Sequence, residues 1–280
     1  MPASLSITTA TLADLARMVD WAALEGWNPG LADAPVFLAT DPGGFLIGRL
    51  GPDPVSAISV VAYGSGFGFL GFYICRPEFR GKGCGFAVWQ AGMKRLGDRV
   101  IGLDGVVDQQ ANYRSQGFVF AHRNVRYGGV AGAASPRDPH VLQPVGDLAE
   151  AVVAYDRAFF AGPREVFTRL WIQRPQTALA YVKDGRVQGY GVIRPSLEGH
   201  KIGPLFADSE AIAETLFSAL SATVVGQPIV IDPPLPNTRA VALAERHGLT
   251  PGFETARMYR GPAPDLPLDR TFGITTFELG

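Results

Sequence analysis

Apolar and polar positions in the first half of the chain alternate between the period of a β-strand and that of an α-helix. Thr11 and Asp14 form an N-terminal capping pattern, and the apolar residues after them recur on one helical face. Gly117 follows a polar stretch, as a residue that ends a helix does. These patterns predict strands at residues 4–9, 45–50, 55–63, 67–75, 100–107 and 118–127 and helices at residues 12–22, 31–37, 86–96 and 108–116.

The second half repeats this order of elements. Asp184 and Gly185 separate two apolar runs, which is a strong signal for a β-hairpin. Each copy is expected to end on a closing strand of its own, at residues 118–127 and 253–260. The second copy predicts strands at residues 178–183, 186–194, 200–206, 228–232 and 253–260 and helices at residues 148–160, 209–223 and 237–247.

The length of the chain supports two domains of the α/β (α+β) class. The chain has 280 residues, of which 47% are hydrophobic, so each half can bury a core. Small residues are frequent after the first copy and predict a linker at residues 131–140. We therefore expect an N-terminal domain at residues 1–130 and a C-terminal domain at residues 141–280.

A glycine-rich loop lies between the apolar run at 67–75 and the helix predicted at 86–96. It reads Arg80-Gly81-Lys82-Gly83-Cys84-Gly85. The first N–H groups of a helix have no partner within it and the helix dipole is positive there, while glycines let the backbone approach a ligand. The loop therefore predicts a site for a phosphate or pyrophosphate, against the alternative of a plain turn. Its spacing differs from the P-loop, in which a lysine would stand in place of Cys84, and from G-x-G-x-x-G.

Pro77 and the spacing Arg80-x-x-Gly83-x-Gly85 resemble the acetyl-CoA signature of the GCN5-related N-acetyltransferase (GNAT) family. The order of predicted elements is also similar to that family's fold. The resemblance implies two tandem domains, each a mixed, mostly antiparallel twisted sheet flanked by helices. It further implies that the strand before the loop pairs with the pantetheine arm of acetyl-CoA, and that a backbone N–H near Ile74 binds the oxyanion. The implied cofactor-binding residues are Tyr73, Ile74, Cys75, Arg80, Gly81, Lys82, Gly83, Cys84 and Gly85.

The corresponding place in the second copy reads Ala207-Asp208-Ser209-Glu210. Its carboxylates would repel a pyrophosphate, and Asp208 and Ser209 are instead good helix caps. We therefore expect one CoA site per chain, with the second half in a structural, dimerising or substrate-covering role. The tandem layout, with the loop at 25–30 and the string at 272–280, resembles a family of two-domain bacterial acetyltransferases.

Tyr113 is the best candidate for the acid that protonates the leaving thiolate. Residues 113–118 read YRSQGF and resemble the family's Y-x-x-x-G-F string, whose tyrosine lies near the CoA sulfur. A phenol with a pKa of about 10 is protonated at neutral pH and can donate. The alternative is a packing tyrosine on a short helix. Asn112 adjoins Tyr113, whereas the family often has an asparagine a turn or two earlier, and the matching position of the second copy is Ala244.

In this fold the loop between the first two helices borders the acceptor site. The resemblance therefore implies substrate-binding positions at Glu25, Trp27, Asn28 and Asp33. Glu25 could take a proton from the acceptor through water, or bind its ammonium group. The alternative is a solvated loop carboxylate, with Trp27 as a lid on the core.

Charge, cysteines and leader patterns argue against several classes of protein. Lys and Arg number 25 and Asp and Glu 26, so the net charge is −1 and no nucleic-acid partner is expected. No apolar stretch reaches the roughly 20 residues of a membrane span, and no signal-peptide pattern is present. The 2 cysteines and 4 histidines have neither disulfide nor metal spacing, which favours a cytoplasmic protein without a metal.

These observations predict an N-acetyltransferase that moves acetyl from acetyl-CoA to a primary amine of a small molecule by direct attack, without a covalent enzyme intermediate. Two alternatives stay open. One is an acyl-CoA-binding regulator that catalyses nothing, and the other is a transferase with a longer acyl donor or a hydroxyl acceptor. The acceptor's identity and association into a homodimer are also open.

Overall fold

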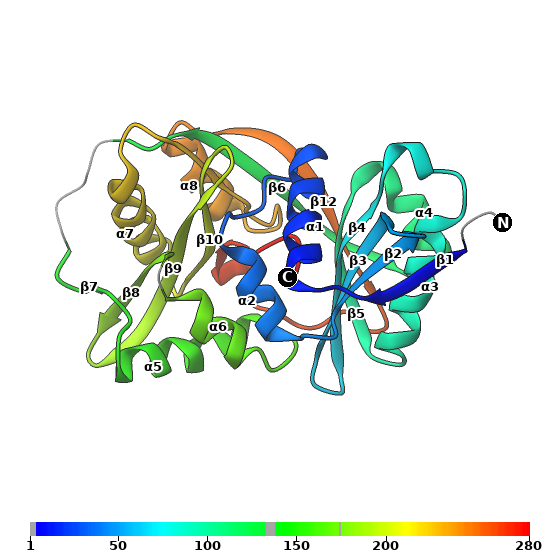
Figure 1. Ribbon diagram of the computed structural model, residues 1–280. Coiled ribbons are helices and arrows are strands. Elements are labelled where there is room, and N and C mark those ends of the chain that lie inside the picture. The colour runs from blue at the N-terminus through cyan, green and yellow to red at the C-terminus, as the bar shows by residue number, and fades with distance from the viewer. Residues whose placement is uncertain (1–3, 133–137, 174) are drawn as a thin grey trace.

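The computed structural model describes residues 4–132, 138–173 and 175–280, and its strands form one continuous sheet through both halves (Figure 1). The strands are β1 (Leu5–Thr9), β2 (Phe45–Leu50), β3 (Asp53–Tyr63), β4 (Phe67–Cys75), β5 (Val100–Val106), β6 (Val119–Val130), β7 (Val141–Leu142), β8 (Thr177–Lys183), β9 (Arg186–Ser196), β10 (Gly199–Ala207), β11 (Pro228–Ile231), β12 (Thr250–Arg260) and β13 (Thr271–Gly273). Their order is β1-β2-β3-β4-β5-β12-β6-β11-β10-β9-β8-β7, and β13 pairs with β10. The β4–β5 and β10–β11 pairs are parallel and the others antiparallel, so the predicted mixed, mostly antiparallel sheet is confirmed.

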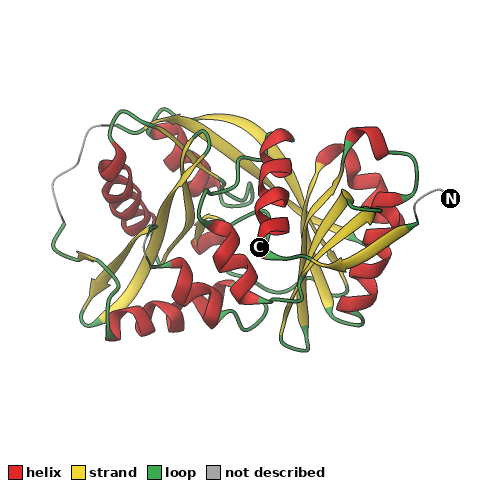
Figure 2. Ribbon diagram, in the orientation of Figure 1, coloured by secondary structure: helices red, strands yellow, loops and turns green. Residues whose placement is uncertain are grey.

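Helices cover both faces of this sheet (Figure 2). They are α1 (Leu12–Leu24), α2 (Asp33–Thr40), α3 (Cys84–Leu96), α4 (Gln110–Ser115), α5 (Asp147–Asp156), α6 (Glu165–Trp171), α7 (Glu210–Ser221) and α8 (Thr238–Arg246). In Figure 1, α1 and α2 lie toward the middle of the molecule, whereas α3 and α4 lie on the outer side of the first sheet segment.

Local sequence signals place most of these elements. The Thr11 hydroxyl accepts the Asp14 N–H at 3.2 Å, and the Asp14 carboxylate accepts the Thr11 N–H at 3.0 Å, which is the predicted capping box of α1. Gly117 has a φ of +85° after α4. The short helix α6 was not predicted. Its Phe167 and Trp171 are buried in the shared core, so tertiary packing stabilises a helix that has little local signal.

The closing strands are exchanged between the halves, and the expectation that each copy ends on its own strand is wrong. β12 lies between β5 and β6, with Thr255 opposite Val106 and Arg260 opposite Ile101. β6 continues past β12 to pair with β11. Figure 1 shows β6 and β12 as long strands that cross between the halves. The sheet of each half is thus completed by a strand from the other half. The domain boundaries at residues 130 and 141 stay a prediction. Of the predicted linker, residues 133–137 lie outside the described residues.

The two halves also share a hydrophobic core. One cluster packs under α3 and α4 and includes Ala256 and Met258 of β12, and another packs under α7 and α8 and includes Val125 and Tyr127 of β6. The third contains residues of α1 and α2 together with residues of α5 and α6. Within it, the Phe37 ring of α2 stacks on the Trp171 ring of α6, with centroids 6.0 Å apart and planes 10° apart. Separating the halves would expose this apolar surface to water.

The C-terminal segment, residues 274–280, runs between the halves (Figure 1). The Ser59 hydroxyl of β3 donates to the carbonyl oxygen of Glu278 at 3.2 Å, and the Tyr63 hydroxyl donates to that of Leu279 at 3.0 Å. From the other half, Arg164 donates to the Gly280 carbonyl oxygen at 3.1 Å. These bonds fix the segment against both halves.

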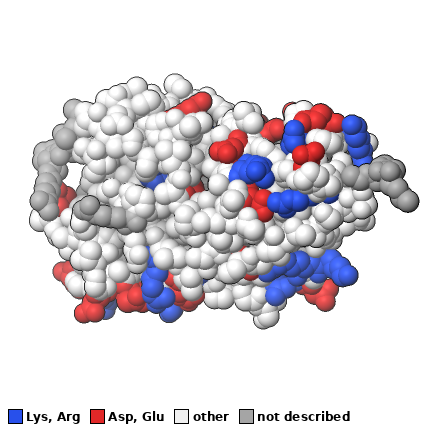
Figure 3. All heavy atoms as spheres, viewed as in Figure 1, with Lys and Arg blue, Asp and Glu red and all other residues white. Residues whose placement is uncertain are grey.

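Charges of both signs lie near one another on the face in Figure 3, and wide uncharged areas separate the groups. Across the described ranges, no helix is both long enough and apolar enough to cross a membrane. Nor do the described His, Cys, Asp and Glu residues form a group of three that could hold a metal ion.

Candidate active site

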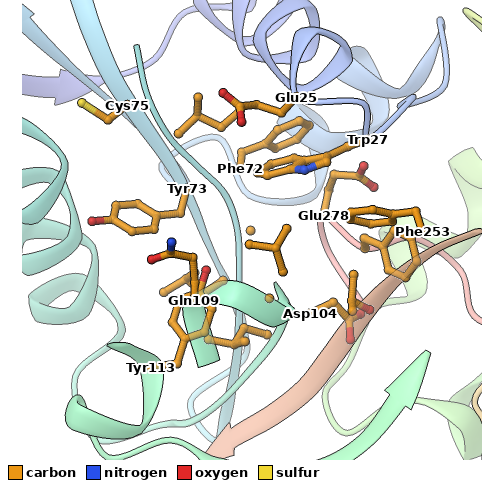
Figure 4. Close-up of a pocket in the computed structure, with 18 of the residues that line it drawn as sticks. Glu25, Trp27, Phe72, Tyr73, Cys75, Asp104, Gln109, Tyr113, Phe253 and Glu278 are labelled. Carbon is orange, nitrogen blue, oxygen red and sulfur yellow. The ribbon is translucent and has the colours of Figure 1, made fainter. Parts of the chain in front are cut away.

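β4 and β5 pair along only part of their length. Their parallel register runs from Phe67 and Val100 to Leu70 and Leu103 and ends there. Beyond this point the strands diverge, and a cavity of about 290 Å³ lies between them (Figure 4). Its walls come from β4, β5, the loop after α1, the glycine-rich loop, α4, β12 and the C-terminal segment. Residues from both halves of the chain therefore form one cavity.

β4 carries a bulge where it borders the cavity. Residues 71–74 of β4 lie opposite residues 57–59 of β3, so one extra residue is accommodated there. Phe72 has a φ of +43°, a conformation that non-glycine residues rarely adopt. The bulge redirects β4 and leaves its edge along Gly71–Cys75 facing the cavity. Tyr73, Ile74 and Cys75, the predicted pantetheine-binding residues, all line it.

The glycine-rich loop leads into α3 in the predicted way. Gly81 and Gly83 have φ angles of +73° and +81°, and Gly83 is the N-cap of α3. A Cβ atom at either position would meet nothing within 4 Å, so the backbone conformation requires glycine and the loop is open to solvent. The Ser56 hydroxyl donates to the Cys84 carbonyl oxygen at 3.1 Å and holds the first turn of α3 against β3. This open start of a helix fits a pyrophosphate group.

Arg80 and Glu25 form an ion pair at the mouth of the cavity. Glu25 is the residue that ends α1, and Arg80 also donates to the Cys75 carbonyl oxygen at 2.9 Å. The side chains of Glu25 and Arg80 are 33% and 52% exposed, so the pair contributes only about 0–1 kcal/mol. Glu25 is therefore engaged with the predicted phosphate loop.

Tyr113 lies on α4 where the cavity meets a second cleft between α3 and α4, which it also lines. Its ring stacks on Trp89 at a centroid distance of 5.8 Å and packs against β5, where a Cβ atom on Gly105 would be 2.2 Å from the ring. No described residue bonds to its hydroxyl. Burial, with a smaller contribution from Tyr73, raises the pKa of Tyr113 well above its usual value, so the phenol stays protonated and can donate.

The loop after α1 is held by Arg126 of β6 and by residues of the second half. Arg126 forms a two-bond ion pair with Asp232, at 2.8 and 2.9 Å, and donates to the Trp27 carbonyl oxygen at 2.9 Å. Trp27 lines the cavity. Asn28 does not, because its amide donates to the Ser196 hydroxyl at 3.1 Å in the β9–β10 hairpin. Asn28 therefore links the two halves of the chain and does not contribute to the cavity.

Asp33 is likewise buried away from the cavity. Its carboxylate accepts from Arg194 Nε at 3.1 Å and from the Gly30 N–H at 2.9 Å. Burial raises the pKa of Asp33, although Arg194 opposes this effect. The structure therefore brings Glu25 and Trp27 to the cavity but leaves Asn28 and Asp33 in structural contacts.

Several cavity residues lie outside the predicted set. β12 contributes Phe253 and Thr255, and the C-terminal segment contributes Phe277 and Glu278. β5 contributes Asp104, which Arg257 binds through two bonds of 2.7 and 2.6 Å. The sequence relates the string at 272–280 to function only through the family resemblance. Without the strand exchange, nothing in the local pattern relates it to β4.

The matching place in the second half has a different construction. Ser209 caps α7 by accepting the Ile212 N–H at 3.4 Å, and Asp208 forms an ion pair with Arg270. Ala244 lies on α8 and is fully buried. The predicted cap is confirmed for Ser209, whereas the Asp208 carboxylate is bonded to Tyr155 and Arg270 and does not cap the helix. With no glycine loop or tyrosine here, we expect only the first half to bind CoA.

Family models match both halves of the chain. The model described as the acetyltransferase (GNAT) family matches residues 12–119, and an acetyltransferase (GNAT) domain model matches residues 152–273. Over 273 residues the chain is 30% identical to the holothin acyltransferase of Pseudoalteromonas sp. (strain SANK 73390). This alignment covers 97% of this chain and 93% of that protein. The chain belongs to the GNAT family. It is therefore a tandem GNAT protein of an acyltransferase family that uses acyl-CoA, and the predicted repeat is confirmed.

Solved structures show the same fold along nearly the whole chain. A Pyrococcus horikoshii protein has a TM-score of 0.82 at 21% identity, covering 99% of this chain and 96% of that one. A tandem GNAT protein from the clavulanic acid biosynthesis pathway has a TM-score of 0.63 at 14% identity, covering 93% and 100%. A GCN5-related N-acetyltransferase from Sphaerobacter thermophilus has a TM-score of 0.62 at 17% identity, covering 94% and 98%.

Proposed function

We propose that this GNAT protein moves an acetyl group from acetyl-CoA to a primary amine of a small molecule. The observation that carries the proposal is the cavity between the diverging ends of β4 and β5. It brings the glycine-rich loop, the bulged strand and Tyr113 together with an acidic, aromatic wall from the second half. These are the parts that thioester binding, oxyanion stabilisation and protonation of a thiolate require.

The donor side of the cavity lies along β4. The first turn of α3 and the loop from Arg80 to Gly85 would hold the pyrophosphate through backbone N–H groups. The edge of β4 from Tyr73 to Cys75 would pair with the pantetheine arm, which orients the thioester beside the bulge. An N–H of this edge would stabilise the oxyanion, and the Tyr113 phenol would give its proton to the leaving thiolate.

The acceptor side is the opposite wall. Trp27, Phe253 and Phe277 present aromatic rings there, which attract a cation, and the carboxylate of Glu278 adds negative charge. A cavity of about 290 Å³ suits a small molecule. The acceptor's ammonium group would first lose a proton through water to Glu25 at the cavity mouth, and the neutral amine nitrogen would then attack the thioester carbon directly. The C–S bond breaks, Tyr113 gives its proton to the thiolate, and the proton that the new amide nitrogen releases restores the phenol, so the proposal needs no enzyme nucleophile.

A thermal-shift titration with acetyl-CoA, CoA and ATP tests the donor site. At 100 times its Kd a ligand stabilises by about 2.7 kcal/mol, so both CoA species should raise the Tm and ATP should not. Release of free thiol from acetyl-CoA in the presence of an amine library then tests the transfer, with longer acyl-CoAs and alcohols as rival substrates. A Tm that ignores CoA, or thiol release that no amine accelerates, contradicts the proposal.

Gly83→Glu provides the matching variant, because it places a carboxylate at the start of α3. We expect it to abolish stabilisation by CoA while the protein stays folded. Gly226→Glu is its control, since Gly226 also has a positive φ, +76°, and open space around its Cβ position, but lies in the second half. Equal CoA binding by the two variants would contradict the assignment of the loop.

A further inference from the structure

Three carboxylates line the cavity, and two of them already have partners. Glu25 pairs with Arg80, and Asp104 pairs with Arg257. Glu278, by contrast, has no Lys, Arg or His nitrogen within 4.0 Å among the described residues. Its charge is thus the one that a ligand in the cavity can still engage.

The Glu278 side chain is held with one oxygen engaged. The Thr276 hydroxyl donates to Oε2 at 2.6 Å and accepts the Glu278 N–H at 2.8 Å. Oε1 is buried and has no hydrogen-bond partner among the described residues, and Glu278 as a whole is 1% exposed. Leaving a buried carboxylate oxygen without a partner is costly, so Oε1 is the atom of this cavity wall that a ligand's donor group can complete.

A second buried polar atom without a described partner occurs on the same cavity. It is the hydroxyl oxygen of Thr255 on β12. In Figure 4, Glu278, Trp27 and Phe253 lie across the cavity from Tyr73 and Tyr113. The Phe253 and Phe277 rings meet edge to face, with centroids 5.9 Å apart. Two oxygen acceptors beside aromatic rings form a receptor for a cation on an apolar body.

The groups behind Glu278 give a rival explanation of its charge. Glu278 helps to raise the pKa of Arg126, which is mainly paired with Asp232. Burial and then Arg126 lower the pKa of Lys201 to about 8, and Glu278 opposes this shift. Lys201 Nζ has no described hydrogen-bond partner and lies 5.9 Å from the Phe277 ring centroid. In this alternative explanation, Glu278 serves only to compensate the positive charges of Arg126 and Lys201.

We propose that Glu278, assisted by Thr255, binds the ammonium group of the acceptor, and that this acceptor carries its amine on a small apolar or aromatic body. The inference rests on the proposed transfer to an amine and adds the residue that recognises that amine. Recognition by a carboxylate distinguishes an amine from an alcohol of the same shape. In this proposal the second half of the chain recognises the acceptor, whereas the first half binds the acyl donor.

Matched pairs of ligands test this inference without turnover. Benzylamine, phenethylamine and tryptamine are each compared with the corresponding alcohol by calorimetry on the full chain, with and without saturating CoA. At least one ammonium ion should bind the wild type about tenfold or more tightly than its alcohol, the range of a hydrogen bond to a charged group. Glu278→Gln should reduce that preference to within about twofold, and Thr255→Val should weaken ammonium binding by about two- to tenfold.

Glu254→Gln is the control variant. Glu254 is the neighbour of Thr255 on β12, but its carboxylate pairs with Arg123 outside the cavity, so the ammonium preference should persist. CoA binding by Glu278→Gln shows that the variant is folded. A wild type that prefers no ammonium, or a preference that survives in Glu278→Gln, overturns the inference in favour of charge balance.

The two levels of the proposal fail in different ways. Absence of CoA binding or of amine-dependent thiol release in the wild type refutes the proposed function. The ammonium preference and its loss in Glu278→Gln are measured by binding alone, so a failure of the Glu278 assignment is distinguishable from a failure of the proposed transfer.

Discussion

Replacing Gly71 with alanine tests whether the C-terminal segment is seated on β4 as the structure describes. A Cβ atom at Gly71 would lie 2.2 Å from the carbonyl oxygen of Glu278 and 2.9 Å from its carbonyl carbon and Cα. These are backbone atoms, so no side chain can rotate to make room. The segment would have to move by about 1 Å to restore van der Waals contact.

The displacement has an estimable cost. It would weaken the hydrogen bonds from Ser59 to Glu278 O, at 3.2 Å, and from Tyr63 to Leu279 O, at 3.0 Å. Both hydroxyls are buried, and a buried donor left without an acceptor costs about 1–3 kcal/mol. Partial loss of the two bonds predicts a decrease in the free energy of unfolding of about 2–4 kcal/mol, or a Tm lower by roughly 4–8 °C for a chain of this size.

Thermal unfolding of Gly71→Ala should be measured beside Gly66→Ala. Gly66 precedes β4 and a Cβ atom there would meet nothing within 4 Å, so its alanine variant should melt like the wild type. Gly71→Ala should also raise the KM for the amine, because Glu278 moves with the segment, while CoA binding persists. If both variants melt within about 1 °C of each other, the segment is not packed against β4 and the reasoning is refuted.

The remaining predictions concern the acid and a buried histidine. Tyr113→Phe keeps the ring that stacks on Trp89, so it should lower kcat by about 100-fold or more and leave acetyl-CoA binding unchanged; wild-type turnover would give Tyr113 a packing role only. His122, which is 8% exposed, has its pKa lowered to about 3, chiefly by burial and secondly by Arg257. As the pH falls, His122 of the unfolded chain takes up a proton near pH 6.5, whereas His122 of the folded chain does so only near pH 3. The free energy of unfolding is therefore unaffected by His122 above pH 6.5 and decreases as the pH falls from 6.5 toward 3. Urea unfolding should show a loss of about 2 kcal/mol between pH 7 and pH 5 that His122→Gln lacks, and parallel pH profiles would contradict the shift.

The fold followed from the sequence where signals are local. The capping pair of Thr11 and Asp14, the Asp184-Gly185 turn and the apolar runs predicted nearly all the strands and helices, because backbone conformation and side-chain periodicity act over a few residues. The pairing of the closing strands could not be predicted in this way. Either of the two similar closing strands could pair with either sheet edge, and the residues of a strand do not determine which half of the chain it completes.

The candidate site likewise has one part that local sequence strings predict and another that only the tertiary structure brings together. Its proposed donor part, from Tyr73 to Gly85 with Tyr113, is contained in two short strings that a sequence displays directly. Its proposed acceptor part consists of single residues from distant segments, Thr255 and Glu278 among them, which share the cavity with Glu25. Asn28 and Asp33 looked equally suitable in the loop, but packing turned them toward the second half.

The sequence by itself thus determined the strand–glycine loop–helix unit, the tandem repeat and the tyrosine string, since each depends on residues that are neighbours along the chain. Tertiary structure alone decided that β6 and β12 exchange places, that the halves share a core and that Glu278 lies on the same cavity as β4. Those outcomes depend on contacts such as Ser59 with Glu278, which are 219 residues apart and have no signature in either segment. They form only when burial of apolar surface brings such segments together.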